Sequence, residues 1–288
     1  MRKRGWWLGL ILLACAPALA ACPPAGQGRA GLQALKAAGF AVADPAGKQA
    51  LAMGLVDCLG DPDPLLRDGI AYEALQHWMR AGDFDAAFLR RVRDALFARL
   101  DGPDPQGVSR PFAALVLAEV ARTDRVAPWM QPAEREAMLA RATAYLGTVQ
   151  DYRGFEPGIG WRHGVAHGAD WLLQLSLNPA LEAAQLRRIL DVVALQAVPA
   201  SGHAYVFGES DRLVQPVAYI ARRGVLVEAD WQAWLASLVA RLGPMPAAGD
   251  AAWLALRHEL TTILSTLYIQ VDASQNEALR TLKPLVAK

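Results

Sequence analysis

Apolar residues recur at spacings of three and four along almost the whole chain, which is the pattern of amphipathic helices. No run of strict apolar and polar alternation bounded by hairpin turns is present, so the pattern does not predict a β-sheet domain. The predicted fold class is all-α. We expect helices at residues 28–38, 47–59, 65–80, 84–100, 111–122, 132–150, 163–177, 182–197, 210–223, 228–242, 248–271 and 274–286.

Short proline-containing breaks separate these predicted helices. Residues 61–64, 102–105 and 243–246 each contain two prolines and cannot continue a helix. No long polar linker interrupts the chain. Helix pairs joined by short turns are typical of an α-solenoid, so we predict a single-domain α-α superhelix, a HEAT-like helical repeat array.

A loose internal repeat supports this prediction. Helices that start with charged or imidazole groups begin near Arg67, Arg110, His163, Glu209 and His258, at intervals of 43, 53, 46 and 49 residues. HEAT-type pairs recur at about 40 to 47 residues. If these helices are equivalent, their first turns share one surface, which would carry Arg67, Asp68, Arg110, His163, His167, Glu209, Arg212, His258 and Glu259. Alternatively, each is a helix-end residue that faces water.

Residues 1–21 are predicted to be an export signal. Arg2, Lys3 and Arg4 form a cationic start, and residues 6–14 form an apolar run too short to remain as a membrane-spanning helix. The mature chain would then consist of an N-terminal tether with a first helix over 22–46 and the superhelix over 47–288.

The sequence leaves two fates open for Cys22. Residues 19–22, Leu-Ala-Ala-Cys, resemble a bacterial lipobox, which would make Cys22 the acylated N-terminus of a lipoprotein on the periplasmic side of a Gram-negative membrane. Membrane attachment would then be through lipid alone. Ala18 to Ala20 also fits ordinary signal cleavage. In that case the protein is soluble in the periplasm, and Cys22 can pair with Cys58 in an oxidising compartment.

The charge balance argues against a nucleic-acid partner. Removing Arg2, Lys3 and Arg4 from the 29 basic residues leaves 26, against 28 acidic residues, a formal charge of −2. No basic footprint for nucleic acid or for a polybasic membrane contact remains.

Residues 150–162 form the most unusual stretch, because glycines and aromatics lie together with two acids and two arginines. Loops on a rigid helical scaffold commonly carry binding groups, so Asp151, Arg153 and Trp161 are candidate ligand-binding residues. Asp151 and Glu156 could act as acid and base on a sugar. The alternative is that Asp151 and Arg153 pair and fix the loop.

A helix after this loop places several polar residues on one face. At about 100° per residue, His163, His167, Asp170 and Gln174 form a narrow stripe. An i, i+4 histidine pair with a carboxylate one turn further could hold a divalent metal, completed by His203 or Glu209. The alternative is a polar stripe that faces solvent or forms hydrogen bonds. We expect no other cofactor.

Several segments over most of the mature chain point to a known family. They are Arg67-Asp68 with Tyr72, Leu75 and Trp78; 110–118 (RPFAALVLA); 151–155 (DYRGF); 160–170 (GWRHGVAHGAD); and 209–213 (ESDRL). On these residues the chain resembles the bacterial domain-of-unknown-function family numbered 2785. Pro111 stands where the family typically has serine, and Arg162 where it has alanine. The resemblance implies a helical fold and a candidate surface, but no reaction.

These observations predict a binding or scaffold module at the cell envelope. Its partner would be an envelope protein or a small ligand held near the candidate residues, including Glu209 and Arg212. The alternative is a hydrolase-like enzyme acting on envelope glycan or peptide, with His163, His167 and Asp170 as metal ligands or acid and base groups.

Overall fold

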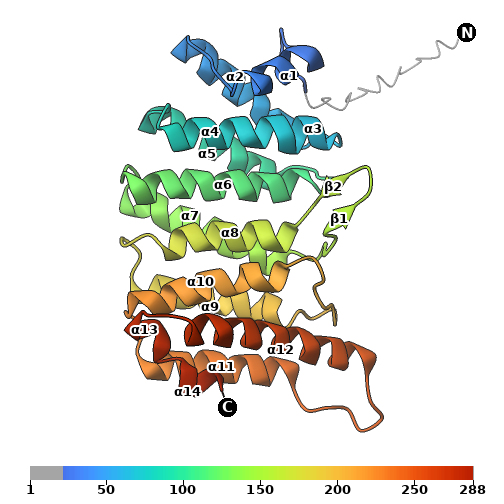
Figure 1. Cartoon of the computed structure of the whole chain (residues 1–288), viewed down its shortest axis with the longest axis vertical. Helices are drawn as coiled ribbons and strands as arrows, with labels where there is room; N and C mark the ends of the chain where they lie inside the picture. The colour runs from blue at the N-terminus through green and yellow to red at the C-terminus, as the bar shows by residue number, and fades with distance from the viewer. Residues whose placement is uncertain (1–21, 288) are drawn as a thin grey trace, which may run out of the picture.

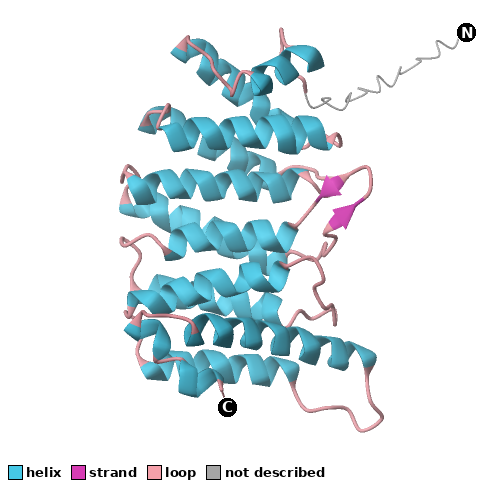
Figure 2. Ribbon diagram, in the orientation of Figure 1, coloured by secondary structure: helices cyan, strands magenta, loops and turns pink. Residues whose placement is uncertain are grey.

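The computed structural model describes residues 22–287, and the predicted export signal lies outside them. The structure is almost entirely helical, as predicted (Figure 2). The helices are α1 (Arg29–Ala37), α2 (Pro45–Cys58), α3 (Pro64–Leu66), the π-helix η1 (Arg67–Tyr72), α4 (Glu73–Ala81), α5 (Ala86–Asp101), α6 (Ser109–Val126), α7 (Pro132–Thr148), α8 (Gly164–Ser176), α9 (Ala183–Ala197), α10 (Glu209–Arg223), α11 (Glu228–Leu242), α12 (Ala251–Asp272), α13 (Glu277–Arg280) and α14 (Lys283–Val286). Two short strands, β1 (Phe155–Glu156) and β2 (Gly160–Trp161), form a hairpin.

The helices stack along the long axis of the molecule, from α1 and α2 at one end to α11, α12 and α14 at the other (Figure 1). Helices α4, α6, α8, α10 and α12 lie side by side in one layer, and α7, α9 and α11 contact one another in the other. These first five are the helices that the internal repeat predicted to be equivalent. Their N-terminal ends lie on the same side of the molecule, which is also the side of the hairpin (Figure 1).

The predicted helix over 65–80 is divided in the structure. Asp63 caps α3 by accepting a hydrogen bond from the amide of Leu65, and the chain then widens into η1 before α4 begins. Sequence periodicity does not distinguish a π-helix from an α-helix over so short a segment. Single-turn π segments occur frequently at functional sites, and this one carries Arg67 and Asp68.

The hairpin was not predicted, because strands of two residues are too short to show alternation. Phe155 pairs with Trp161 and Glu156 with Gly160. Gly158 and Gly160 have φ angles of +83° and +80°, a backbone conformation that glycine adopts without steric cost. The glycines of the predicted loop therefore allow a tight turn between the two strands.

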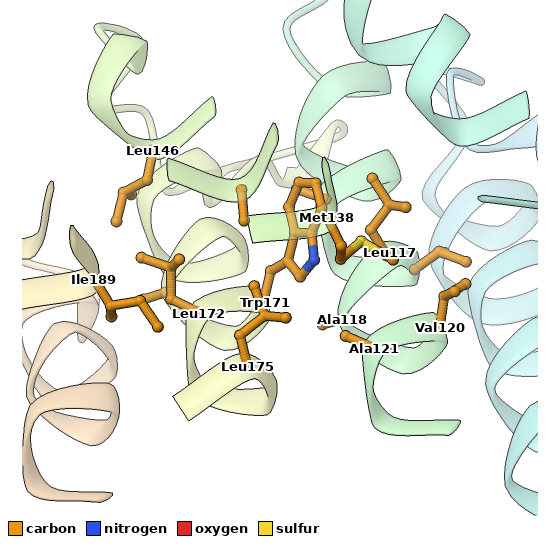
Figure 3. Packing of buried hydrophobic residues seen from close by; sticks show 14 of the residues in the cluster. Leu117, Ala118, Val120, Ala121, Met138, Leu146, Trp171, Leu172, Leu175 and Ile189 are labelled. Atoms are coloured by element: carbon orange, nitrogen blue, oxygen red, sulfur yellow. The ribbon is translucent and has the colours of Figure 1, made fainter. Parts of the chain in front are cut away.

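One hydrophobic core runs through the layers. Trp171 on α8 is fully buried and lies among Met138, Leu117 and Leu175 (Figure 3). A Cβ atom at Gly168 would lie 3.0 Å from Leu146 Cδ1, so this glycine lets α7 approach α8 closely. Such close packing stabilises the stack because protein interiors are as dense as organic crystals.

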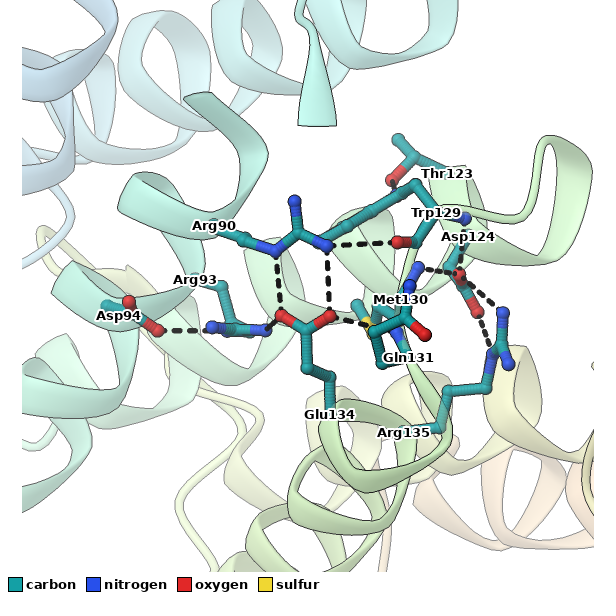
Figure 4. A network of polar contacts seen from close by, with 10 residues as sticks. All are labelled: Arg90, Arg93, Asp94, Thr123, Asp124, Trp129, Met130, Gln131, Glu134 and Arg135. Carbon is teal, nitrogen blue, oxygen red and sulfur yellow. Dashed lines mark hydrogen bonds and ion pairs between the residues drawn. The ribbon is translucent and has the colours of Figure 1, made fainter. Parts of the chain in front are cut away.

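A buried polar network lies at the C-terminal end of α6. Asp124 is 1% exposed and accepts hydrogen bonds from the amides of Trp129 and Met130 and from Arg135 (Figure 4). Burial alone would raise the pKa of Asp124, but these donors outweigh it and lower the pKa. The network fixes the turn between α6 and α7.

The N-terminal segment is part of the same fold. Cys22 and Cys58 form a disulfide bond, which joins the chain ahead of α1 to the end of α2. Leu32 is fully buried in the core, and Phe40 accepts a hydrogen bond of 2.8 Å from Trp78 Nε1 through its carbonyl. Residues 22–46, predicted as a tether with a first helix, are therefore packed against the array.

Of the two states predicted for Cys22, the structure has the disulfide bond with Cys58. A sulfur in a disulfide bond cannot also carry a diacylglycerol thioether, so lipidation of Cys22 would require this bond to be absent. Within residues 22–287, no helix combines the length and apolarity that crossing a membrane requires.

Candidate functional site

Arg67 anchors the hairpin to the helical array. Its side chain is fully buried, and Nη2 donates a hydrogen bond of 2.7 Å to the carbonyl oxygen of Ile159, while Nη1 donates one of 3.1 Å to that of Asp61. The guanidinium carbon lies 4.8 Å from the ring centre of Phe112. Arg67, predicted as a ligand-binding residue, therefore holds the loop in place.

Asp68 is the ionic partner of Arg67. Its Oδ1 lies 2.6 Å from Arg67 Nε, and its side chain is 29% exposed. Burial raises the pKa of Asp68, while the positive charge of Arg67 opposes that rise. The pair neutralises a charge that the fold has removed from water.

Exposed aromatic side chains gather on the outer face of the hairpin. Phe155, Trp161 and Phe207 are 46%, 40% and 40% exposed. The ring centre of Trp161 lies 5.2 Å from that of Phe155 and 6.1 Å from that of Phe207. Gly154 makes this possible, because a Cβ atom there would overlap the ring of Phe207. We call Phe155, Trp161 and Phe207 the aromatic surface.

His163 lies directly behind this surface. It precedes α8 with a φ angle of 52°, in the left-handed region, and its ring centre is 4.1 Å from that of Trp161. Its Nε2 atom is buried and has no hydrogen-bond partner among residues 22–287. Burial, reinforced by the positive charge of Arg212, lowers the pKa of His163 to about 4, so the ring is neutral at neutral pH.

His167 lies one turn further into α8 and is 8% exposed. Its Nδ1 atom is 3.1 Å from the carbonyl oxygen of Pro111. Because that oxygen can only accept, Nδ1 carries the proton in this tautomer. Burial, reinforced by the nearby His163, lowers the pKa of His167 to about 3.

Asp170 completes the stripe on α8. Both of its carboxylate oxygens lie 2.7 Å from Nη1 of Arg212 on α10. Burial raises the pKa of Asp170, and the charge of Arg212 opposes that rise. Gln174 accepts a hydrogen bond from Arg125 on α6. Within the stripe, His167, Asp170 and Gln174 thus form hydrogen bonds that link α8 to α6 and α10, whereas Nε2 of His163 has no partner among residues 22–287.

The predicted metal ligands do not converge. Within residues 22–287, no group of three or more His, Cys, Asp or Glu side chains is placed to hold a metal ion. Of the two distant ligands considered, His203 stacks on Tyr152 at 4.7 Å, and Glu209 accepts a hydrogen bond of 2.9 Å from the amide of Phe207. Glu209 thus holds the backbone of Phe207, a residue of the aromatic surface, in place.

A second group of predicted residues lies beside a pocket of ≈ 470 Å³ between the ends of α5 and α7 and the first turn of α6. Arg110 and Asp151 line this pocket. Arg153 donates hydrogen bonds to Asp151 through Nε, at 2.8 Å, and through Nη2. This is the loop-fixing pair that the sequence offered as the alternative to an acid and base.

Glu156, the other proposed acid or base, binds Arg162. Arg162 is 5% exposed, and the sequence indicated it only as a departure from the family pattern. Arg162 directly follows Gly160 and Trp161 of the glycine-rich loop. That loop was the one sequence feature that could have indicated an ordered element at Arg162. Both carboxylates of the proposed catalytic pair are therefore tied to arginines.

The last member of the predicted row does not align. His258 is exposed in the second turn of α12, which begins at Ala251 rather than near His258. Glu259 is fully buried, accepting hydrogen bonds from Ser210 Oγ at 2.7 Å and from the amide of Tyr205 at 3.0 Å. Burial raises the pKa of Glu259. Glu259 was expected on the shared surface of the helix row, whereas it is buried and holds the segment ahead of α10.

Contacts nevertheless connect most of the remaining predicted row. Arg67 contacts Phe112, Phe112 contacts His167 at 5.1 Å between ring centres, and His167 lies beside His163 and Asp170 on α8. The fold and this site define an α-helical repeat protein whose candidate site residues surround an inserted hairpin.

The chain belongs to the family described as "Protein of unknown function (DUF2785)", whose match covers residues 96–269. The matched segment includes the hairpin, the histidines and the aromatic surface, whereas Arg67 and Asp68 precede it. No match was found among the curated proteins or among the solved structures.

Proposed function

We propose that this protein is a non-catalytic binding module of the cell envelope and that its aromatic surface binds a polypeptide partner. The observation that carries the proposal is the cluster of Phe155, Trp161 and Phe207, three large aromatic side chains exposed together. Contiguous exposed apolar patches mark interaction sites on soluble proteins. Aromatic and arginine side chains contribute most of the binding energy at protein interfaces.

A polypeptide suits the surroundings of this patch better than a small molecule. Neither Trp161 nor Phe207 lines the 470 Å³ pocket, and small ligands are usually enclosed by concave sites. Arg212, whose side chain is 52% exposed and whose charge acts on His163 behind the patch, supplies a charged margin. An apolar centre with a polar rim is the anatomy of a protein interface.

The surface is also held rigid before any partner binds. Arg67 fixes the hairpin backbone, and Glu209 fixes the amide of Phe207. A rigid surface loses less conformational entropy on binding, which strengthens the affinity.

Two observations support export. The N-terminal 21 residues have the pattern of an export signal, and a Cys22–Cys58 disulfide would form in an oxidising compartment. Because one sulfur cannot serve both purposes, we propose a soluble exported protein rather than a lipid-anchored one.

Site-specific photo-crosslinking tests the binding proposal. A photo-reactive phenylalanine analogue replaces Phe207 in one variant and Val239, exposed on α11 far from the hairpin, in the control. We expect a defined crosslinked product, identified by mass spectrometry, from position 207 only. The protein identified in that crosslinked product, once purified, should bind the wild-type protein. It should bind the Trp161→Ala variant at least tenfold more weakly. Equal crosslinking from both positions, or unchanged affinity in Trp161→Ala, would contradict the proposal.

A further inference from the structure

The pocket beside the hairpin has the composition of a small-molecule site. Its volume of ≈ 470 Å³ lies within the range of about 300 to 1,000 Å³ usual for such sites. Leu100, Pro111, Tyr145 and Val149 give it apolar walls. The charged residues of the lining are Asp101, Asp104, Arg110, Arg141 and Asp151, and the remainder are Gly107, Ala144, Thr148, Gln150 and Gly164.

Two arginines in this lining keep unused donors. Arg110 donates through Nε and Nη2 to the carbonyl oxygen of Gly102, at 3.3 and 2.9 Å, and forms no ion pair with any residue of the described chain. Arg141 donates through Nη2 to Asp101 at 2.5 Å and to the carbonyl oxygen of Phe97. Both guanidinium groups act on Asp101, whose pKa Arg141 lowers most and Arg110 lowers further.

The acidic residues of the pocket are already occupied. Asp104 accepts hydrogen bonds from the amides of Val108, Ser109 and Arg110, at 3.0, 3.0 and 2.9 Å. Asp151 is held by Arg153, and Asp101 by Arg141. The carboxylates of the pocket are therefore satisfied, whereas Nη1 of Arg110 and Nε and Nη1 of Arg141 donate no hydrogen bond within residues 22–287.

Gly107 brings the Asp151–Arg153 pair against the pocket. A Cβ atom at this position would lie 2.6 Å from Asp151 Oδ2 and 2.8 Å from Arg153 Nη2. The glycine therefore lets a neutral ion pair form part of the wall, and Asp151 is not left as an unpaired negative charge that would repel an anion.

We propose that this pocket binds a small organic acid, whose carboxylate reaches Arg110 and Arg141 while its apolar part contacts Pro111 and Tyr145. Guanidinium groups match a carboxylate in geometry as well as charge. The pocket and the aromatic surface consist of different residues. The organic-acid proposal is therefore independent of the polypeptide-binding proposal.

Ligand-observed NMR titration with three probes tests the chemistry. Sodium benzoate carries both halves of the proposed ligand, benzamide lacks the charge, and sodium sulfate lacks the apolar half. We expect saturable binding of benzoate and at least tenfold weaker binding of the other two. Benzamide binding as tightly as benzoate, sulfate binding as tightly as benzoate, or no saturable benzoate binding would each overturn the proposal.

Two variants with matched controls place the binding in this pocket. Arg110→Ala removes a donor and should weaken benzoate binding by about tenfold, the effect of one lost charge-assisted hydrogen bond, whereas Arg241→Ala, exposed on α11, should not. Ala144→Trp fills the pocket from an exposed position and removes no charge, whereas Ala140→Trp lies one turn earlier on α7, outside the lining. Unchanged binding in both Arg110→Ala and Ala144→Trp, with each folded by circular dichroism, would overturn the assignment.

Discussion

The guanidinium of Arg67 donates a 2.7 Å hydrogen bond to the backbone carbonyl of Ile159, which lies 92 positions further along the chain. The bond joins the π-helix η1 to the turn of the hairpin. The hairpin that carries Phe155 and Trp161 is therefore positioned by a buried side chain from a helix that precedes the family match. The position of the proposed binding surface therefore depends on a contact between residues that are remote in sequence.

Replacing Arg67 should destabilise the protein and release the hairpin. The Arg67→Met variant keeps much of the buried volume but leaves Asp68 and two carbonyl oxygens without their donor. We expect a loss of about 3 kcal/mol in the free energy of unfolding, as for other broken buried ion pairs, measured by urea denaturation. Faster amide exchange at Arg162 and His163, whose amides bind the carbonyls of Gly154 and Arg153, would show the release. Arg241→Met serves as the exposed control.

The Cys22–Cys58 bond should be detectable in protein purified from an exporting host. Non-reducing digestion followed by mass spectrometry should yield one peptide containing both cysteines, and Cys58→Ser should lower the free energy of unfolding by about 2 to 4 kcal/mol. A diacylglycerol-modified Cys22 with a free thiol at Cys58, and protein in the membrane fraction, would instead support the lipoprotein.

His167 should make the fold sensitive to acid. The pKa of histidine is 6.5 when unperturbed and is lowered to about 3 at His167 in the folded protein. The folded state therefore binds fewer protons between these values, and the stability present above pH 6.5 is lost as the pH falls towards 3, by about 1.4 kcal/mol per pH unit. The shift at His163 acts in the same direction.

A comparison of unfolding between pH 7 and pH 4 measures this effect. The His167→Gln variant should show a shallower decrease in the free energy of unfolding than the wild type, whereas His258→Gln, at an exposed position, should follow the wild type. Parallel pH profiles for His167→Gln and the wild type would show that His167 is not held neutral by burial.

Asp170 and Arg212 should be energetically coupled. Asp170 is 17% exposed at its side chain and Arg212 is 52% exposed, so solvent weakens the pair and we expect a coupling energy of about 1 kcal/mol. A double-mutant cycle of Asp170→Asn and Arg212→Ala, each measured by urea denaturation, isolates this energy. Additive single effects would mean that the contact does not stabilise α8 against α10.

The sequence alone determined the helical class and the order of the helices. Apolar spacing and proline breaks act locally, so the helix at Glu228–Leu242 was predicted at its observed bounds, and the equivalence of α4, α6, α8 and α10 followed from their spacing. The loop at 150–162 was identified because glycines and aromatics are unusual together. The Asp151–Arg153 pair lies within three residues and could be proposed as one of two alternatives.

Only the tertiary structure decided which distant groups meet. Glu259 was placed on a surface by its position in a helix, yet it is buried against Ser210 and Tyr205. His163, His167 and Asp170 share a helix face, as the 3.6-residue period requires, but the partners of that face come from Pro111 on α6 and Arg212 on α10. Helical periodicity states which residues share a face; it does not state what is packed against that face, because this depends on contacts between helices 40 or more residues apart.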